Sequence, residues 1–146
     1  MINRHEDLAA TLTRLVRAFV AAELPILKRH ELSMWGYIVL VELGRRPMSS
    51  QTVLAQEIGA DKTRIIGTLD KLQNAGLITR EPDPTDRRAR LLTITERGAE
   101  LRKAVQGEIQ ANEDRVLSTV SATERRAFLR TATRLAELPR EEFLND

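Results

Sequence analysis

Basic side chains concentrate in two short stretches near the middle of the chain. The first stretch combines two cations with a hydroxyl and an apolar side chain: Lys62, Thr63, Arg64 and Ile66. The second places three arginines within four positions: Arg87, Arg88 and Arg90. Ammonium and guanidinium groups bind phosphate oxygens, and a guanidinium also matches the acceptor edge of guanine. The two stretches therefore indicate a surface that binds a polyanion such as nucleic acid.

The first stretch lies at the start of a predicted helix over 62–75. Residues near the start of such a helix can reach base edges in the major groove, where arginine binds guanine and an apolar side chain meets a thymine methyl group. We therefore expect Arg64 to read a base, with Ile66 beside it. Phosphate contacts, which fix the register without reading the sequence, are expected from three side chains: Ser50, Lys62 and Thr63. Taken singly, each of these is equally compatible with a solvated position or a helix cap.

The second stretch lies at the tip of a predicted hairpin with strands over 77–79 and 90–95. The segment 81–86 carries two prolines and three acidic residues, a composition typical of turns. Arginine inserted into a narrow minor groove gains from the negative potential there, and we expect this of Arg88. Asp86 lies two positions earlier and could hold that guanidinium by a charge-assisted hydrogen bond. Without the helices described next, a charged, solvated hairpin would be the better interpretation.

Two short helices before the hairpin have the spacing of a helix-turn-helix. The first is predicted to begin at a cap, Ser49 or Ser50, and to end at Gly59; the second begins at Asp61. Six apolar or small residues carry the spacing: Leu54, Ala55, Ile58, Gly59, Ile65 and Leu69. Alone, this pattern also describes an ordinary pair of packed helices. With a basic hairpin directly after the second helix, it predicts a winged helix.

Helices are also predicted before this region. Apolar residues recur at steps of three and four over 8–20, as in an amphipathic helix. Pro25 leaves open whether 26–29 continue this helix or form a separate turn. A second helix, apolar on most sides, begins at the cap Ser33 and ends at Gly44.

The chain after the hairpin is predicted to form two more helices. Thr95 can start a long helix, and the capping-box sequence over 121–124 opens the last one, which ends before Pro139. In the second strand, Leu92 and Ile94 are expected to face the core. The predicted fold is mainly α, a winged helix-turn-helix with six helices and a small β-hairpin wing.

Length and composition limit the class of protein. The chain has 146 residues, of which 42% are hydrophobic and 30% charged, enough for one buried core. The net charge of +2 is too small to name a polyanionic partner by itself. The absence of cysteine excludes disulfides and zinc-thiolate sites. The length predicts one domain over 1–146. Since no apolar run approaches the roughly 20 residues of a membrane span, we expect the protein in the cytoplasm and without membrane contact.

No residues form a catalytic constellation. Asp83 and Asp86 lie in a turn expected to be wet, without a neighbouring His, Cys or glycine-rich phosphate loop, which argues against a hydrolase. His5 and His30 are isolated, so neither a metal nor a cofactor is expected. The alternative to DNA binding is a winged helix used as a protein-interaction module, but such a module would not need the two basic stretches.

Three motifs span the predicted winged helix: Leu54-Ala55 with Gly59, Leu69-Asp70-Lys71-Leu72 with Ala75-Gly76-Leu77-Ile78, and Asp83-Pro84-Thr85-Asp86-Arg87-Arg88 with Leu92-Thr93-Ile94-Thr95-Glu96-Arg97-Gly98. These motifs resemble those of the multiple antibiotic resistance regulator (MarR) family of bacterial winged-helix transcription factors. The last segment is specific and the others support it. The motifs cover about 54–98, while the order of elements agrees over nearly the whole chain.

The resemblance implies a homodimer that binds a pseudo-palindromic operator and represses transcription until a small-molecule effector relieves it. It implies a winged-helix lobe over about 34–98 and a dimerisation region over about 5–30 and 99–140. It also implies that Arg88 is the minor-groove arginine with Asp86 as its partner, and that 62–66 contact the major groove. Gly67 departs from the family, because many members carry a basic side chain at that position. The operator sequence therefore cannot be inferred from relatives.

Two further expectations concern the segments outside the lobe. The terminal amphipathic segments carry more apolar surface than the lobe can cover, which independently favours a dimer. A symmetric dimer would separate its recognition helices by about one turn of DNA, or a multiple, at roughly 10 base pairs per turn. Four residues lie where such a family would enclose a ligand, although ordinary core packing is the better explanation for them: Phe19, His30, Trp35 and Tyr37.

Overall fold

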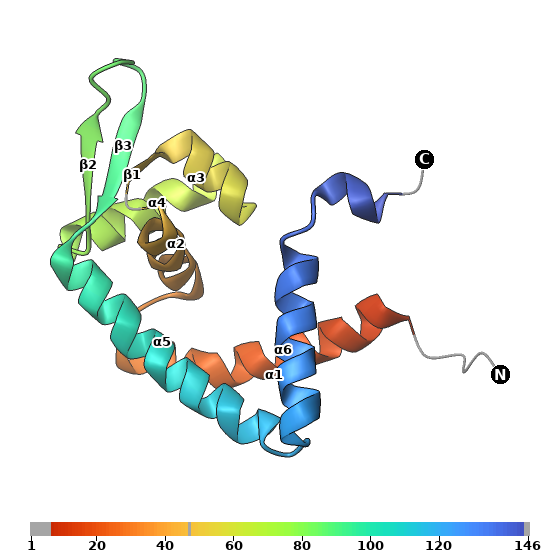
Figure 1. The fold of residues 1–146 in the computed structure, drawn as a ribbon. Coiled ribbons are helices and arrows are strands. Elements are labelled where there is room, and N and C mark those ends of the chain that lie inside the picture. The colour runs from red at the N-terminus through yellow and green to blue at the C-terminus, as the bar shows by residue number, and fades with distance from the viewer. Residues whose placement is uncertain (1–6, 47, 145–146) are drawn as a thin grey trace. The chain divides into compact units, whose positions relative to one another are not determined.

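The computed structural model describes residues 7–46 and 48–144 (Figure 1). His5 therefore lies outside the described residues. In chain order the elements are α1 (Leu8–Arg29), α2 (Met34–Arg45), β1 (Met48–Ser50), α3 (Gln51–Ile58), α4 (Lys62–Asn74), β2 (Ile78–Pro82), β3 (Arg90–Ile94), α5 (Glu96–Leu117), α6 (Ala122–Ala136) and the 3-10 helix η1 (Arg140–Phe143). The six helices and the hairpin are those predicted, while β1 and η1 were not expected.

Helix α1 runs through Pro25 without interruption and ends at Arg29. The two residues after the proline, Ile26 and Leu27, are buried, with 7% and 1% of their surface exposed. Burial of two large aliphatic side chains offsets the roughly 3 kcal/mol that a proline costs inside a helix. Of the two courses that the sequence left open, the continuous helix is therefore the one adopted.

The helix-turn-helix forms with the predicted signals. Ser50, and not Ser49, caps α3, since its hydroxyl oxygen accepts a hydrogen bond of 3.1 Å from the N–H of Val53. Gly59 ends α3 with φ at +67°, in the left-handed region that favours glycine. The carboxylate of Asp61 then caps α4. Three local signals that the sequence predicted therefore set the ends of α3 and the start of α4.

The hairpin belongs to an antiparallel sheet of three strands in the order β1-β3-β2. Strand β2 pairs with β3 from Ile78 opposite Ile94 to Pro82 opposite Arg90, so it begins one residue later than predicted and continues further. Figure 1 shows the two strands extending beyond α4 as a finger. Leu92 is fully buried, and Ile94 packs against the core, which confirms the predicted orientation of β3.

The buried core is continuous over one part of the chain. It combines aliphatic side chains from α1 to α5, among them Leu40, Leu54, Leu69 and Leu92, and its last member is Ile109. The structure divides into two compact units, one ending at Ile109 and the other beginning at Gln110. None of the described residues after Ile109 is buried. The second unit, which includes α6 and η1, therefore has no core of its own.

The predicted capping box is present at the start of α6. The hydroxyl oxygen of Ser121 accepts a hydrogen bond from the N–H of Glu124, and the Glu124 carboxylate accepts one from the N–H of Ser121. Thr95 likewise precedes α5, and its hydroxyl oxygen accepts a hydrogen bond of 3.0 Å from the N–H of Gly98. Both helices thus begin where their sequences predicted.

Candidate nucleic-acid interface

The first basic stretch lies on the exposed side of α4. Ile65, Leu69 and Leu72 bury the opposite side of this helix in the core. The four predicted contact residues of the helix are all exposed: Lys62, Thr63, Arg64 and Ile66. Ile66 is 44% exposed, which is notable for a large aliphatic side chain. This surface is therefore available for a partner.

Thr63 takes part in the cap of its own helix. The Asp61 carboxylate oxygen Oδ1 accepts hydrogen bonds from the Thr63 N–H at 3.2 Å and from the Thr63 hydroxyl at 3.4 Å. A hydroxyl held in this way keeps its oxygen as an acceptor, while its donor is occupied. A phosphate contact by the Thr63 hydroxyl would compete with this bond, and that contact stays a prediction.

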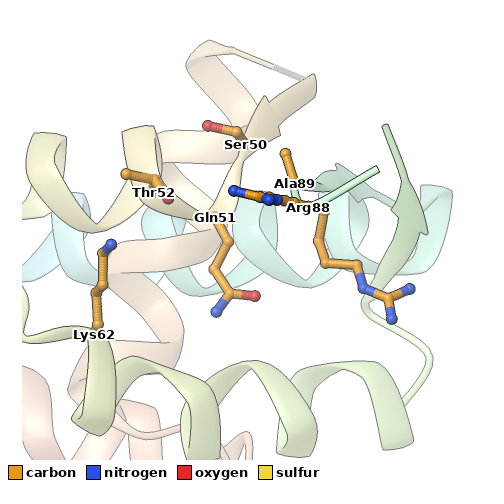
Figure 2. A pocket seen from close by; sticks show the side chains of 7 residues that line it. Ser50, Gln51, Thr52, Lys62, Arg88 and Ala89 are labelled. Atoms are coloured by element: carbon orange, nitrogen blue, oxygen red, sulfur yellow. The ribbon is translucent and has the colours of Figure 1, made fainter. Parts of the chain in front are cut away.

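The start of α3, the start of α4 and the wing enclose a hollow of about 160 Å³. Its lining residues are Ser50, Gln51, Thr52, Lys62, Arg88, Ala89 and Arg90. Figure 2 shows Gln51 between Lys62 and Arg88 in that view, so residues far apart in the sequence face the same hollow. An open hollow with three cations fits the oxygen atoms of a phosphate backbone.

Four of the predicted contact residues meet at this hollow: Ser50, Lys62, Arg88 and Arg90. The other predicted residues do not line it: Thr63, Arg64, Ile66, Asp86 and Arg87. Gln51 and Thr52 line it but were not predicted. Their position directly after the expected cap Ser50 is the signal that could have found them, because the first N–H groups of a helix attract phosphate.

The tip of the wing is held by hydrogen bonds within its own backbone and short side chains. Oδ1 of Asp83 accepts the N–H and the hydroxyl of Thr85, both at 2.8 Å, and the N–H of Asp83 donates to the carbonyl oxygen of Ala89 at 3.0 Å. The bond from the Thr85 N–H is the main reason why the pKa of Asp83 lies below its ordinary value. A charged Asp83 therefore maintains the turn that presents the arginines.

Asp86 does not act on Arg88 in the way that the sequence suggested. Its Oδ1 accepts a hydrogen bond of 3.0 Å from the backbone N–H of Arg88, not from the guanidinium. A short carboxylate two positions before an N–H forms this local turn readily. Asp86 thus fixes the backbone at Arg88, while the exposed arginine side chain stays available to a partner.

The four predicted effector residues are half-buried in α1 and α2 or at the end of α1: Phe19, His30, Trp35 and Tyr37. His30 Nε2 lies 3.3 Å from Oε2 of Glu108, which also accepts a hydrogen bond of 3.1 Å from Arg29. A pocket of about 170 Å³ beside the start of α2 is lined by other residues, including Leu32, Gly36 and Lys71. A ligand site at these four residues remains a prediction.

The described residues contain no group of three or more His, Cys, Asp or Glu side chains that could hold a metal ion. Within the same residues, no helix is long and apolar enough to cross a membrane.

Comparison with known proteins gives consistent matches. The family described as the MarR family matches residues 31–89, from just before α2 to the wing. A solved structure of MarR is 30% identical, with a TM-score of 0.76 over 90% of this chain and 96% of that chain. A MarR-family transcriptional regulator from Rhodococcus sp. RHA1 is 27% identical, with a TM-score of 0.79 over 90% and 93%. The transcriptional repressor CouR, solved bound to a 23-mer DNA duplex, is 26% identical, with a TM-score of 0.75 over 89% and 92%.

The family model matches the central part of the chain, while the three solved structures each match about nine-tenths of it. The match to MarR combines 30% identity with nearly complete coverage of both chains. On this evidence the chain belongs to the MarR family of winged-helix transcription regulators.

Proposed function

We propose that this protein is a sequence-specific transcriptional repressor that binds double-stranded DNA as a homodimer. The observation that carries the proposal is the hollow between the start of α3, Lys62 of α4 and Arg88 and Arg90 of the wing. A single stretch of phosphate backbone could occupy it while α4 lies in the major groove and the wing tip in the minor groove. CouR, a transcriptional repressor with a similar fold, is bound to a 23-mer DNA duplex in its solved structure.

Each part of the surface has a separate role in this proposal. Lys62, Arg90 and the polar residues at the start of α3 bind phosphate and fix the register. Arg64 reads a base edge in the major groove, and Ile66 contacts a thymine methyl group. Arg88 enters the minor groove, where narrow spacing of the phosphates strengthens the attraction of a cation.

Exposed apolar side chains support the homodimer. On α1, Leu8, Leu12 and Val16 repeat every four residues and are 58%, 40% and 57% exposed. On α6, Phe128, Leu129 and Leu135 are between 41% and 45% exposed. Apolar stripes of this kind on a soluble domain mark surfaces that another chain covers. We propose that the two stripes form a two-fold interface, which places the two recognition helices one or more DNA turns apart.

We also propose that the protein acts in the cytoplasm, where its DNA lies, and that a small molecule relieves its repression of transcription. Trp35, the single tryptophan, lies half-buried in α2 close to the expected site. A ligand there should change its fluorescence and release the protein from DNA in the same concentration range. A fluorescence change without release would argue against an effector role.

The decisive experiment is selection of bound sequences from a random duplex library. The expected result is an inverted repeat whose half-sites lie about 10 base pairs, or a multiple, apart. The matched control is a variant with Arg87, Arg88 and Arg90 changed to alanine, which keeps the helices but loses the wing cations. No enrichment by the natural protein would favour the alternative of a protein-interaction module, while equal enrichment by the variant would show that DNA recognition does not need the wing cations.

A further inference from the structure

Arg80 connects the wing to the recognition helix. It lies on β2, and its Nε donates a hydrogen bond of 2.7 Å to Oε1 of Gln73, while its Nη2 donates to the Asp70 carboxylate. Asp70 and Gln73 are three positions apart on α4, so both lie on one side of that helix. One guanidinium thus bonds two turns of the helix at once.

The position of Arg80 on the sheet suits this bridge. Successive side chains of a strand alternate between its faces, so Arg80 shares a face with Ile78, which is buried in the core. The side chain of Arg80 is only 21% exposed, against 51% for that of Asp70. Along the strand Arg80 lies between the core and the tip, opposite Leu92. Its bonds to Asp70 and Gln73 therefore attach the middle of β2 to α4.

The charge of Asp70 is otherwise unfavourable at its position. Lys62, Ile66 and Asp70 follow one another at intervals of four, so Asp70 continues the exposed side of α4 that carries the proposed DNA contacts. An unpaired carboxylate there would repel phosphates. The ion pair with Arg80 neutralises it, and this explains how an acidic residue can stand on that side of the helix.

We infer that Arg80 is a positioning residue for DNA recognition, and that Asp70 is its anchor. The inference rests on the proposed function. By fixing β2 against α4, the pair lets Arg88 and the start of α4 meet adjacent grooves in one encounter. Two contacts held at a fixed spacing bind more tightly than two that must be brought together separately, because the second contact then forms at a high effective concentration.

Asp70→Ala tests the inference by the sign of its effect. If charge alone mattered, removal of a carboxylate from this side of α4 would strengthen binding to a polyanion. A positioning role predicts the opposite, a loss of about tenfold in affinity for the selected duplex. The matched control is Glu57→Ala, which removes one acidic side chain and its 3.5 Å ion pair with Arg46 in the same lobe, away from the hollow. The control should leave affinity within about twofold.

Dimethyl sulfate footprinting separates positioning from a general loss of structure. The reagent methylates N7 of guanine in the major groove and N3 of adenine in the minor groove. At saturating protein, Asp70→Ala should keep the guanine protection under α4 and lose the adenine protection under the wing. Arg80→Lys keeps the charge but replaces the two donor nitrogens of the guanidinium by a single ammonium nitrogen. It should give a milder form of the same pattern, with circular dichroism melting as the check on folding.

The inference about Arg80 and the proposed function would fail in different ways. Unchanged or tighter binding by Asp70→Ala would overturn the inference, and so would parallel loss of protection in both grooves by the folded variants. If the natural protein bound no duplex at all, the proposed function itself would fail. If it bound an inverted repeat and Asp70→Ala bound equally well, the proposed function would stand and only the role of Arg80 would be lost.

Discussion

Gly98 should be among the least replaceable residues of this fold. It lies in the first turn of α5, where the helix packs against the end of the turn before the hairpin. A Cβ atom added there would overlap the carbonyl oxygen of Leu77 and lie 3.0 Å from Cγ1 of Ile94. The Leu77 oxygen cannot easily move, because it accepts a hydrogen bond of 3.0 Å from the Thr95 N–H, while the Thr95 hydroxyl donates to the carbonyl oxygen of Gly76 at 2.7 Å.

The expected cost of Gly98→Ala follows from these contacts. Overpacking against a side chain costs roughly 1–3 kcal/mol, and here one of the atoms belongs to a pinned backbone, so the upper end applies. The higher helix propensity of alanine returns about 1 kcal/mol. We therefore expect a net loss of about 2 kcal/mol or more in the free energy of unfolding. Gly107→Ala is the matched control, because Gly107 lies in the same helix and nothing is within 4 Å of its Cβ position.

Urea unfolding followed by circular dichroism measures both variants. Protomer concentrations must be equal, since the proposed dimerisation would contribute to stability. Gly107→Ala should gain up to about 1 kcal/mol from helix propensity alone. The free energies of unfolding of the two variants should therefore lie on opposite sides of that of the natural protein and differ from each other by about 3 kcal/mol. If Gly98→Ala unfolded at the same urea concentration as Gly107→Ala, the close approach of α5 to Leu77 would be disproved.

Three other outcomes are expected. Arg88→Ala should weaken binding to selected and random duplexes alike. In fluorescence anisotropy titrations it should also reduce the slope of log K against log salt by about 0.9. An unchanged slope would show that Arg88 neutralises no phosphate charge. Arg64→Ala should instead cost about 1–3 kcal/mol at the preferred site only, and equal losses on random DNA would refute its role in reading a base. Hydrogen bonding from the backbone N–H of Ser121 holds the pKa of Glu124 below its ordinary value of 4.5. The charged carboxylate therefore stabilises the fold above pH 4.5, and this stabilisation is lost as the pH falls through the lowered pKa. Glu124→Gln should accordingly be less stable than the natural protein at neutral pH and no less stable in acid, as thermal melting at several pH values would show.

Much of this fold could be predicted from the sequence because its signals are local. Ser33, Ser50 and Asp61 accept hydrogen bonds from N–H groups two or three residues away, so the start of each helix is encoded within one turn. Gly59 adopts its left-handed conformation at the position that the pattern required. Interactions of this range do not depend on where the rest of the chain goes.

The sequence alone could not settle features that depend on distant partners. Pro25 continues α1 because the two residues after it are buried in the core, and no local signal contains that burial. Gln51 becomes part of the candidate site only because the wing folds back toward the start of α3. Arg80 bonds Asp70 and Gln73 only because packing sets the path of the turn between α4 and β2. The sequence by itself determined which helices form and which cations they carry, through contacts within one turn; tertiary packing decided which of those side chains share a surface, since only the folded core brings separate elements together.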